Sequence, residues 1–69
     1  MIVYSPLWET MKSKGVTTYA LIHKHHISSS TISRLKHNQG VTTQLIDALC
    51  VILQCEVDEI MNFETPNDN

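Results

Sequence analysis

The sequence predicts a small all-α domain, and three observations support this. Hydroxyl residues suited to helix N-caps recur along the chain, apolar residues follow them at helical spacing, and strand signals are confined to residues 2–4 and 62–63. The 69 residues are expected to form one domain, 1–69, with a frayed tail over about residues 65–69. A domain of this size buries only about 60% of its unfolded surface, so a large enzyme cleft is not expected.

Helix starts are marked along the chain in order. Ser5-Pro6 is a cap residue followed by proline at the first helical position. Three later starts share one pattern, an apolar residue followed by a hydroxyl residue: Val16-Thr17, Ile27-Ser28 and Val41-Thr42. With each hydroxyl residue as N-cap, an apolar residue falls at the fourth helical position, where it completes a hydrophobic staple.

Helix ends are marked by Gly15 and by residues 38–40, which contain asparagine and glycine. Helices are therefore predicted near residues 5–14, 17–25, 28–37, 42–54 and 57–62. Apolar residues at helical spacing support the first and the fourth of these: Leu7, Trp8 and Met11, then Leu45, Ile46, Leu49, Ile52 and Leu53.

Charge is distributed unevenly, although the net charge is only −2. No acidic residue occurs from Thr10 to Ile46, whereas all five lysines and arginines and all four histidines lie in that stretch. One face of the molecule is therefore predicted to suit an anion, and the alternative is an ordinary solvated surface. The chain has neither an apolar run of about 20 residues nor a signal-peptide pattern, so we expect a cytoplasmic protein.

The second and third predicted helices are joined by only about three residues, 25–27, and so short a joint is typical of a helix-turn-helix. On a helical wheel of the third helix, Ile32 and Leu35 face the core. The outward positions are Ser29, Ser30, Ser33, Arg34 and His37. Short polar side chains at the leading end of a helix suit a major groove about 12 Å wide, where hydroxyls can contact base edges and phosphates.

Nearly the whole chain, from Leu7 to Phe63, resembles the Cro and phage-repressor type of helix-turn-helix regulator, often called XRE-like. The resemblance is carried by TTYALIHKHHISSSTISRLK as the motif, GVTTQLIDALCVIL as the following core helix and QCEVDEIMNF as the ending. It implies a five-helix, all-α, repressor-like domain with the helix-turn-helix at helices 2 and 3. It also implies a non-enzymatic repressor without cofactors, which binds double-stranded DNA as a homodimer on an inverted-repeat site.

The resemblance also implies functional residues by position. Base contacts are expected from Ser29, Ser30 and Arg34, and the helical wheel adds Ser33 to this group. Phosphate contacts are expected from Thr17, Thr18, Ser28, Lys36, His37 and Asn38. No catalytic or metal-binding residue is expected.

The sequence departs from the family pattern in the turn between the two helices. His26 lies where glycine is usual, Ile22 where alanine is usual, and His25 where an apolar residue is usual. A residue at the glycine position must adopt a positive φ, which histidine, asparagine and aspartate tolerate better than other non-glycine residues. His26 is therefore predicted to have a positive φ.

Three competing interpretations apply to these residues. His23, His25 and His26 with the two cysteines suggest a zinc site, but the histidines diverge around a helix end and the cysteines are not a CxxC pair. Serine-histidine catalysis lacks a carboxylate to orient the base. The main alternative is a protein-interaction module of the same fold, antirepressor-like or antitoxin-like, which the acid-free face disfavours.

Two further expectations concern the cysteines and the chain ends. Cys50 and Cys55 are too few for a secreted disulfide scaffold and are expected to be reduced, half-buried thiols, and a disulfide between them would cross a helix end. Apolar residues near the termini are candidates for a dimer surface, or alternatively close the core of the monomer: Ile2, Val3, Tyr4, Ile60, Met61 and Phe63.

Overall fold

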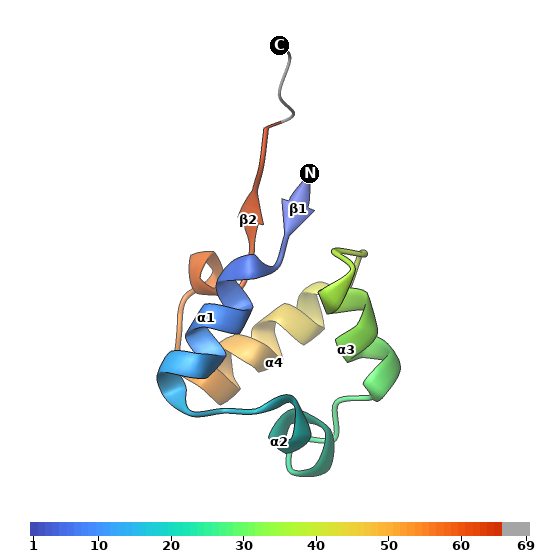
Figure 1. Cartoon of the computed structure of the whole chain (residues 1–69), viewed down its shortest axis with the longest axis vertical. Helices are drawn as coiled ribbons and strands as arrows, with labels where there is room; N and C mark the ends of the chain where they lie inside the picture. Colours follow the sequence, from blue (N-terminus) through green and yellow to red (C-terminus); the bar gives the residue numbers. More distant parts are fainter. Residues whose placement is uncertain (66–69) are drawn as a thin grey trace.

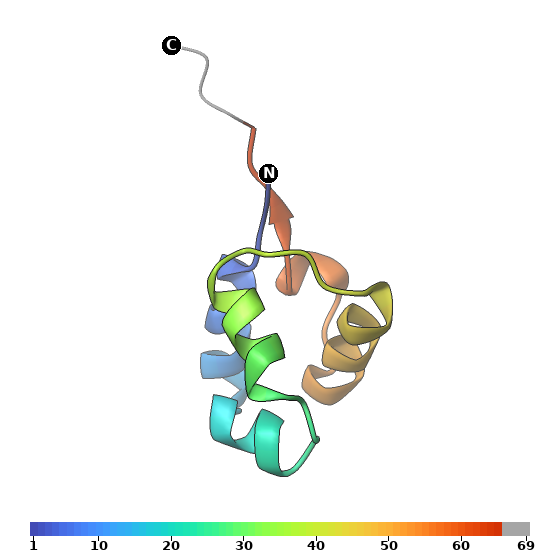
Figure 2. The same ribbon diagram turned by 90° about the vertical axis from the view of Figure 1, so that its right-hand side faces the viewer.

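The computed structural model describes residues 1–65, a body of helices with a strand pair projecting from one end (Figure 1). In chain order the elements are β1 Ile2–Val3, α1 Ser5–Lys14, α2 Thr18–His23, α3 Ser29–Lys36, α4 Thr43–Leu53, the 3-10 helix η1 Val57–Glu59 and β2 Asn62–Phe63. The turned view shows the loop between α3 and α4 passing over the end of the body nearest the strands, with α2 at the opposite end (Figure 2). The expected frayed tail falls almost wholly on residues 66–69, outside the described residues.

The prediction of five α-helices was wrong. The segment expected to be helical over 57–62 forms only the three-residue η1, followed by β2. Glu56 and Glu59 form a capping box around η1, but Ile60 is fully buried and the chain then pairs with the N-terminal segment. The pairing is antiparallel, with Ile2 opposite Phe63 and Val3 opposite Asn62. Residues 62–63 therefore satisfy backbone groups by strand pairing instead of by a helix.

The three hydroxyl caps are confirmed. The side chains of Thr17, Ser28 and Thr42 accept hydrogen bonds from the backbone N–H three residues later. Ser5 was wrongly predicted as a cap, because α1 already begins at Ser5 and no side chain caps it. Pro6 still lies in the first turn, where its missing N–H removes no helical hydrogen bond.

Left-handed residues terminate three of the helices. Gly15, Asn38 and Gln54 follow α1, α3 and α4 with φ of 70°, 56° and 51°. After each of them the chain turns back, and the next residue donates its N–H to a carbonyl five residues earlier, as in a Schellman motif. Glycine or asparagine was foreseen at the first two ends, but nothing in the sequence marked Gln54.

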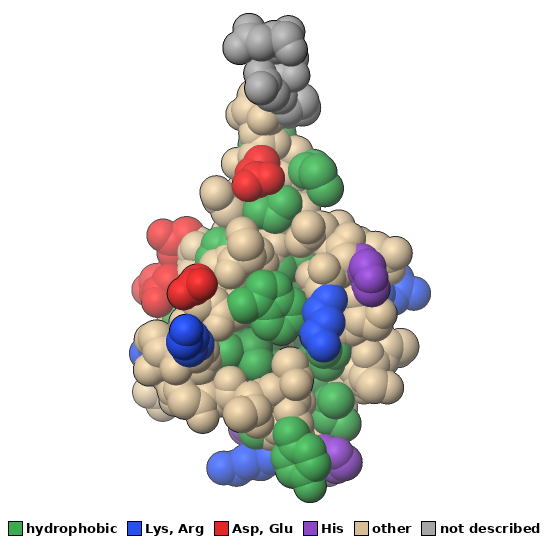
Figure 3. Space-filling view, viewed as in Figure 1, with side chains coloured by type: hydrophobic (Ala, Val, Ile, Leu, Met, Phe, Trp, Pro, Cys, Tyr) green, Lys and Arg blue, Asp and Glu red, His purple; other side chains and the backbone are tan. Residues whose placement is uncertain are grey.

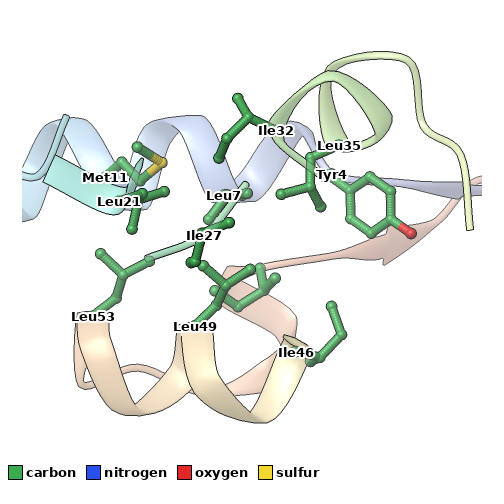
Figure 4. Close-up of a cluster of buried hydrophobic side chains, with 11 residues drawn as sticks. Tyr4, Leu7, Met11, Leu21, Ile27, Ile32, Leu35, Ile46, Leu49 and Leu53 are labelled. Carbon is green, nitrogen blue, oxygen red and sulfur yellow. The ribbon is translucent and has the colours of Figure 1, made fainter. Parts of the chain in front are cut away.

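The core lies between α1, α3 and α4, with one side chain each from α2 and from the turn that follows it (Figure 4). Its fully enclosed side chains are Leu7, Leu21, Leu35, Leu49, Leu53 and Ile60. One buried polar residue, Thr10, sits at the edge of this core and donates its hydroxyl to the carbonyl of Glu59 at 2.7 Å. This bond ties α1 to η1 and satisfies the buried hydroxyl of Thr10.

Candidate nucleic-acid interface

α2 and α3 form a helix-turn-helix whose joint is organised by His26. His26 has φ 59°, which confirms the prediction of a left-handed conformation. The turn it makes allows Ile27 to donate its N–H to the carbonyl of Leu21 at 3.0 Å, and both of these side chains are buried. α2 consequently ends at His23, two residues before the predicted end.

α3 has one buried face and one exposed face, as predicted. Ile32 and Leu35 are buried against the core. The four residues expected to contact bases are all exposed: Ser29, Ser30, Ser33 and Arg34. The helix therefore presents short hydroxyl side chains and one guanidinium to solvent along a single side, an arrangement that fits hydrogen bonding to base edges.

Three hydroxyls form a local network at the start of α3. Ser28 Oγ lies 3.1 Å from Ser30 Oγ and 2.8 Å from Thr31 Oγ1, and it accepts from the backbone N–H of Thr31 at 3.2 Å. The hydroxyls of Ser28 and Ser30 are therefore oriented before any ligand arrives. Ser29 and Ser33, in contrast, have no side-chain partner among the described residues.

The residues expected to contact phosphate flank α3 on both sides. Thr17 is exposed and Thr18 is half-buried at the start of α2, while Lys36 is exposed near the end of α3. His37 places Nδ1 2.8 Å from the carbonyl oxygen of Ser33. Asn38 accepts the N–H of Tyr4 with its Oδ1, and this bond orients its Nδ2, the side-chain group that can donate to an external anion.

A groove of about 640 Å³ runs between α3 and the start of α4. Polar lining comes from Ser28, Thr31, Arg34 and Thr42, and apolar lining from Ile27, Val41 and Leu45. Arg34 thus lies at the boundary between the exposed face of α3 and this groove. Thr31 and Thr42 were missed as surface candidates, because sequence reasoning used Thr42 only as a helix cap and placed Thr31 on neither face of α3.

Another missed feature is an aromatic pair on α2. The rings of Tyr19 and His23 lie with centroids 4.2 Å apart, and Tyr19 is 70% exposed. Their spacing of four residues, which places side chains on the same helix face, was the available signal.

The acidic residues are separated from α3 in space as they are along the chain. In Figure 3 the acidic side chains lie on the side of α1 and the C-terminal elements, next to some of the basic ones, whereas the side over α3 shows basic and histidine side chains without acids. This follows from the acid-free stretch from Thr10 to Ile46, which contains both helices of the helix-turn-helix. The field over α3 therefore favours a polyanion.

Among residues 1–65, no group of three or more histidine, cysteine or acidic side chains is placed to hold a metal ion. Cys50 and Cys55 lie beyond the end of the chain segment that carries the histidines, and both are free and half-buried. In the same part of the chain, every helix is too short or too polar to cross a bilayer.

Comparisons with known proteins agree with this geometry. The sequence profile of the Cro/C1-type HTH DNA-binding domain matches residues 6–66. The crystal structure of the transcriptional regulator VanUg superimposes with a TM-score of 0.80 at 24% identity, covering 88% of this chain and 81% of that one, which establishes a common fold. A search of curated proteins found no relative.

Proposed function

Because the chain belongs to the Cro/C1-type helix-turn-helix DNA-binding domains, we propose that it is a sequence-specific regulator of transcription, acting as a repressor. α3 enters the major groove of duplex DNA and α2 crosses the backbone. The observation that carries this proposal is the exposed face of α3, which bears Ser29, Ser30, Ser33 and Arg34 and lies within a stretch, Thr10 to Ile46, that contains no acidic residue.

Within this interface the side chains have different tasks. Arg34 donates two parallel hydrogen bonds to guanine, and the serines contact neighbouring base edges. Thr17, Thr18, Ser28, Lys36, His37 and the free Nδ2 of Asn38 contact phosphates and set the register of α3 in the groove. The internal bonds of Ser28, His37 and Asn38 support this task, because they hold the backbone on both ends of α3 in place.

We further propose that two copies bind an inverted repeat as a homodimer, with half-sites about one helical turn apart. Of the six apolar residues near the termini, Val3, Tyr4 and Ile60 are buried within the monomer. Ile2 and Phe63 face each other across the strand pair and are 37% and 62% exposed, which leaves them available for a second copy. Sedimentation at micromolar concentration, with and without DNA, tests the dimer; a monomer in both cases contradicts it.

Selection of bound duplexes from a random pool tests the regulator proposal directly. We expect a palindromic sequence to be recovered, and we expect the protein to lose affinity as salt rises, because phosphate neutralisation releases counterions. Recovery of no enriched sequence would contradict specific DNA binding and would favour a protein-interaction module of the same fold.

A further inference from the structure

The two cysteines occupy a defined pair of positions at the end of α4. Gln54 is left-handed with φ 51°, and Cys55 donates its backbone N–H to the carbonyl of Cys50 at 3.1 Å. Gln54 donates to the carbonyl of Val51 at 3.3 Å. These two bonds are those of a Schellman motif, in which the side chains at the positions of Cys50 and Cys55 come into contact.

The same motif at the end of α1 has an apolar pair at these positions. There Val16 donates its N–H to the carbonyl of Met11 at 2.9 Å around the left-handed Gly15. Met11 is buried, and Val16 packs against the core. The side-chain contact at the end of α1 is therefore made by two apolar residues, whereas the equivalent positions at the end of α4 hold two thiols.

The thiols at α4 are also accessible. Both line a cavity of about 510 Å³ whose other walls include Tyr4, Ile46 and Met61. Cys50 and Cys55 are free and only half-buried, and the cavity that they line offers a small reagent a route toward them. The cavity shares only Val41 with the groove beside α3, so this site is separate from the proposed DNA interface.

We propose that Cys50 and Cys55 form a dithiol site that small-molecule disulfides, such as oxidised glutathione, convert to an intramolecular disulfide. One cysteine thiolate attacks a sulfur of the reagent, and the reagent disulfide breaks to release one thiol. The second cysteine thiolate then attacks the protein-bound sulfur of the mixed disulfide and releases the second thiol. Two electrons and two protons pass to the reagent, which leaves as two thiols while one S–S bond forms in the protein.

The environment of Cys55 agrees with close contact between the thiols. Burial, the neighbouring Cys50 and the carboxylate of Glu59 raise the pKa of the Cys55 thiol, and Lys14 lowers it. A raised pKa leaves less of the Cys55 thiolate at a given pH and slows its exchange reactions, so the ring-closing step depends on the two sulfur atoms lying close together. Proximity is what the turn at Gln54 provides.

The test is anaerobic incubation of the full chain with excess oxidised glutathione, followed by acid quenching, alkylation of remaining thiols and intact-mass measurement. We expect a monomer lighter by two hydrogens with no alkyl group added. A lasting glutathione adduct, two alkylated thiols or a disulfide-linked dimer would each overturn the proposal.

Two comparisons separate proximity in the fold from the mere presence of two cysteines. The folded chain should form the disulfide at a ratio of oxidised to reduced glutathione at least about tenfold lower than the urea-unfolded chain. Equal ratios would contradict the proposal. Cys50→Ser and Cys55→Ser, with folding checked by circular dichroism, should each stop at a single mixed disulfide; no adduct on either variant would show that the thiols are inaccessible and would also overturn it.

Discussion

Asn38 accepts a hydrogen bond from the backbone N–H of Tyr4, with 3.0 Å between the nitrogen and Oδ1. Tyr4 in turn donates its hydroxyl to the carbonyl of Gln39 at 2.9 Å. These two bonds fasten the loop after α3 to the residue that precedes α1. The N-terminal segment therefore holds in place a loop that we propose lies along the DNA backbone.

Replacing Asn38 tests this link. Asn38→Ala removes the acceptor for the N–H of Tyr4 and places alanine in a left-handed conformation, so we expect a loss of about 1 to 3 kcal/mol in the free energy of unfolding. Asn38→Asp keeps an oxygen acceptor and tolerates the same φ, so it should cost clearly less. Urea denaturation measures both, and equal stability of wild type and Asn38→Ala would contradict the assignment.

His26→Gly should stabilise the domain. A left-handed φ of 59° costs a residue with a side chain about 1 to 2 kcal/mol, and glycine does not have this cost. Glycine loses about 0.5 to 1 kcal/mol of chain entropy on folding, so the net gain in the free energy of unfolding should be about 0.5 to 1 kcal/mol. His25→Gly is the matched control, because His25 does not have a positive φ and should lose stability. A destabilised His26→Gly would mean that the imidazole makes compensating contacts.

Substitutions of Arg34 and of Lys36 should impair DNA binding in different ways. Arg34→Ala should cost about 1 to 3 kcal/mol on the selected site and relax the preference at one base position per half-site. Lys36→Ala should weaken binding to all sequences alike and reduce the slope of the salt dependence by about one unit per half-site. Titrations of both variants on selected and scrambled duplexes at several salt concentrations measure this. If Arg34→Ala loses equal affinity for the selected and the scrambled duplex, Arg34 does not read a base.

Alkylation of Cys55 should require higher pH in the folded chain than in the unfolded one. The thiolate is the reactive form, and burial and Glu59 raise the pKa of this thiol, so less thiolate is present at any given pH. The rate of iodoacetamide labelling is measured in Cys50→Ser, where only one thiol reacts.

Two charge variants in that background test the cause by moving the rate curve in opposite directions. Glu59→Gln removes an anion and should shift the curve to lower pH, whereas Lys14→Gln removes a cation and should shift it to higher pH. Shifts of the same sign in both variants would rule out the charge explanation.

Local signals predicted much of this domain. A hydroxyl that caps a helix acts on an N–H three residues away, so Thr17, Ser28 and Thr42 could be identified from the sequence. The amphipathic face of α3 depends only on helical periodicity, and its buried and exposed residues were correctly divided. Resemblance to the family supplied the expectation of a left-handed residue at His26, because it showed which position normally carries glycine.

Long-range contacts decided the rest. The sequence showed strand signals at residues 2–4 and 62–63 but also predicted a helix over 57–62, and the antiparallel pairing of Asn62 and Phe63 with Val3 and Ile2, about sixty residues away in sequence, decided between the two. The same holds for Asn38, whose oxygen accepts from the N–H of Tyr4, 34 residues away in sequence, which fixes the direction in which its Nδ2 can donate. Helix starts and helix faces thus follow from neighbours within a few residues. The strand pairing of residues 62–63 and the anchoring of the loop after α3 depend on contacts between segments far apart in sequence. The approach of Cys50 and Cys55 is local, but it depends on the left-handed Gln54, which the sequence did not mark.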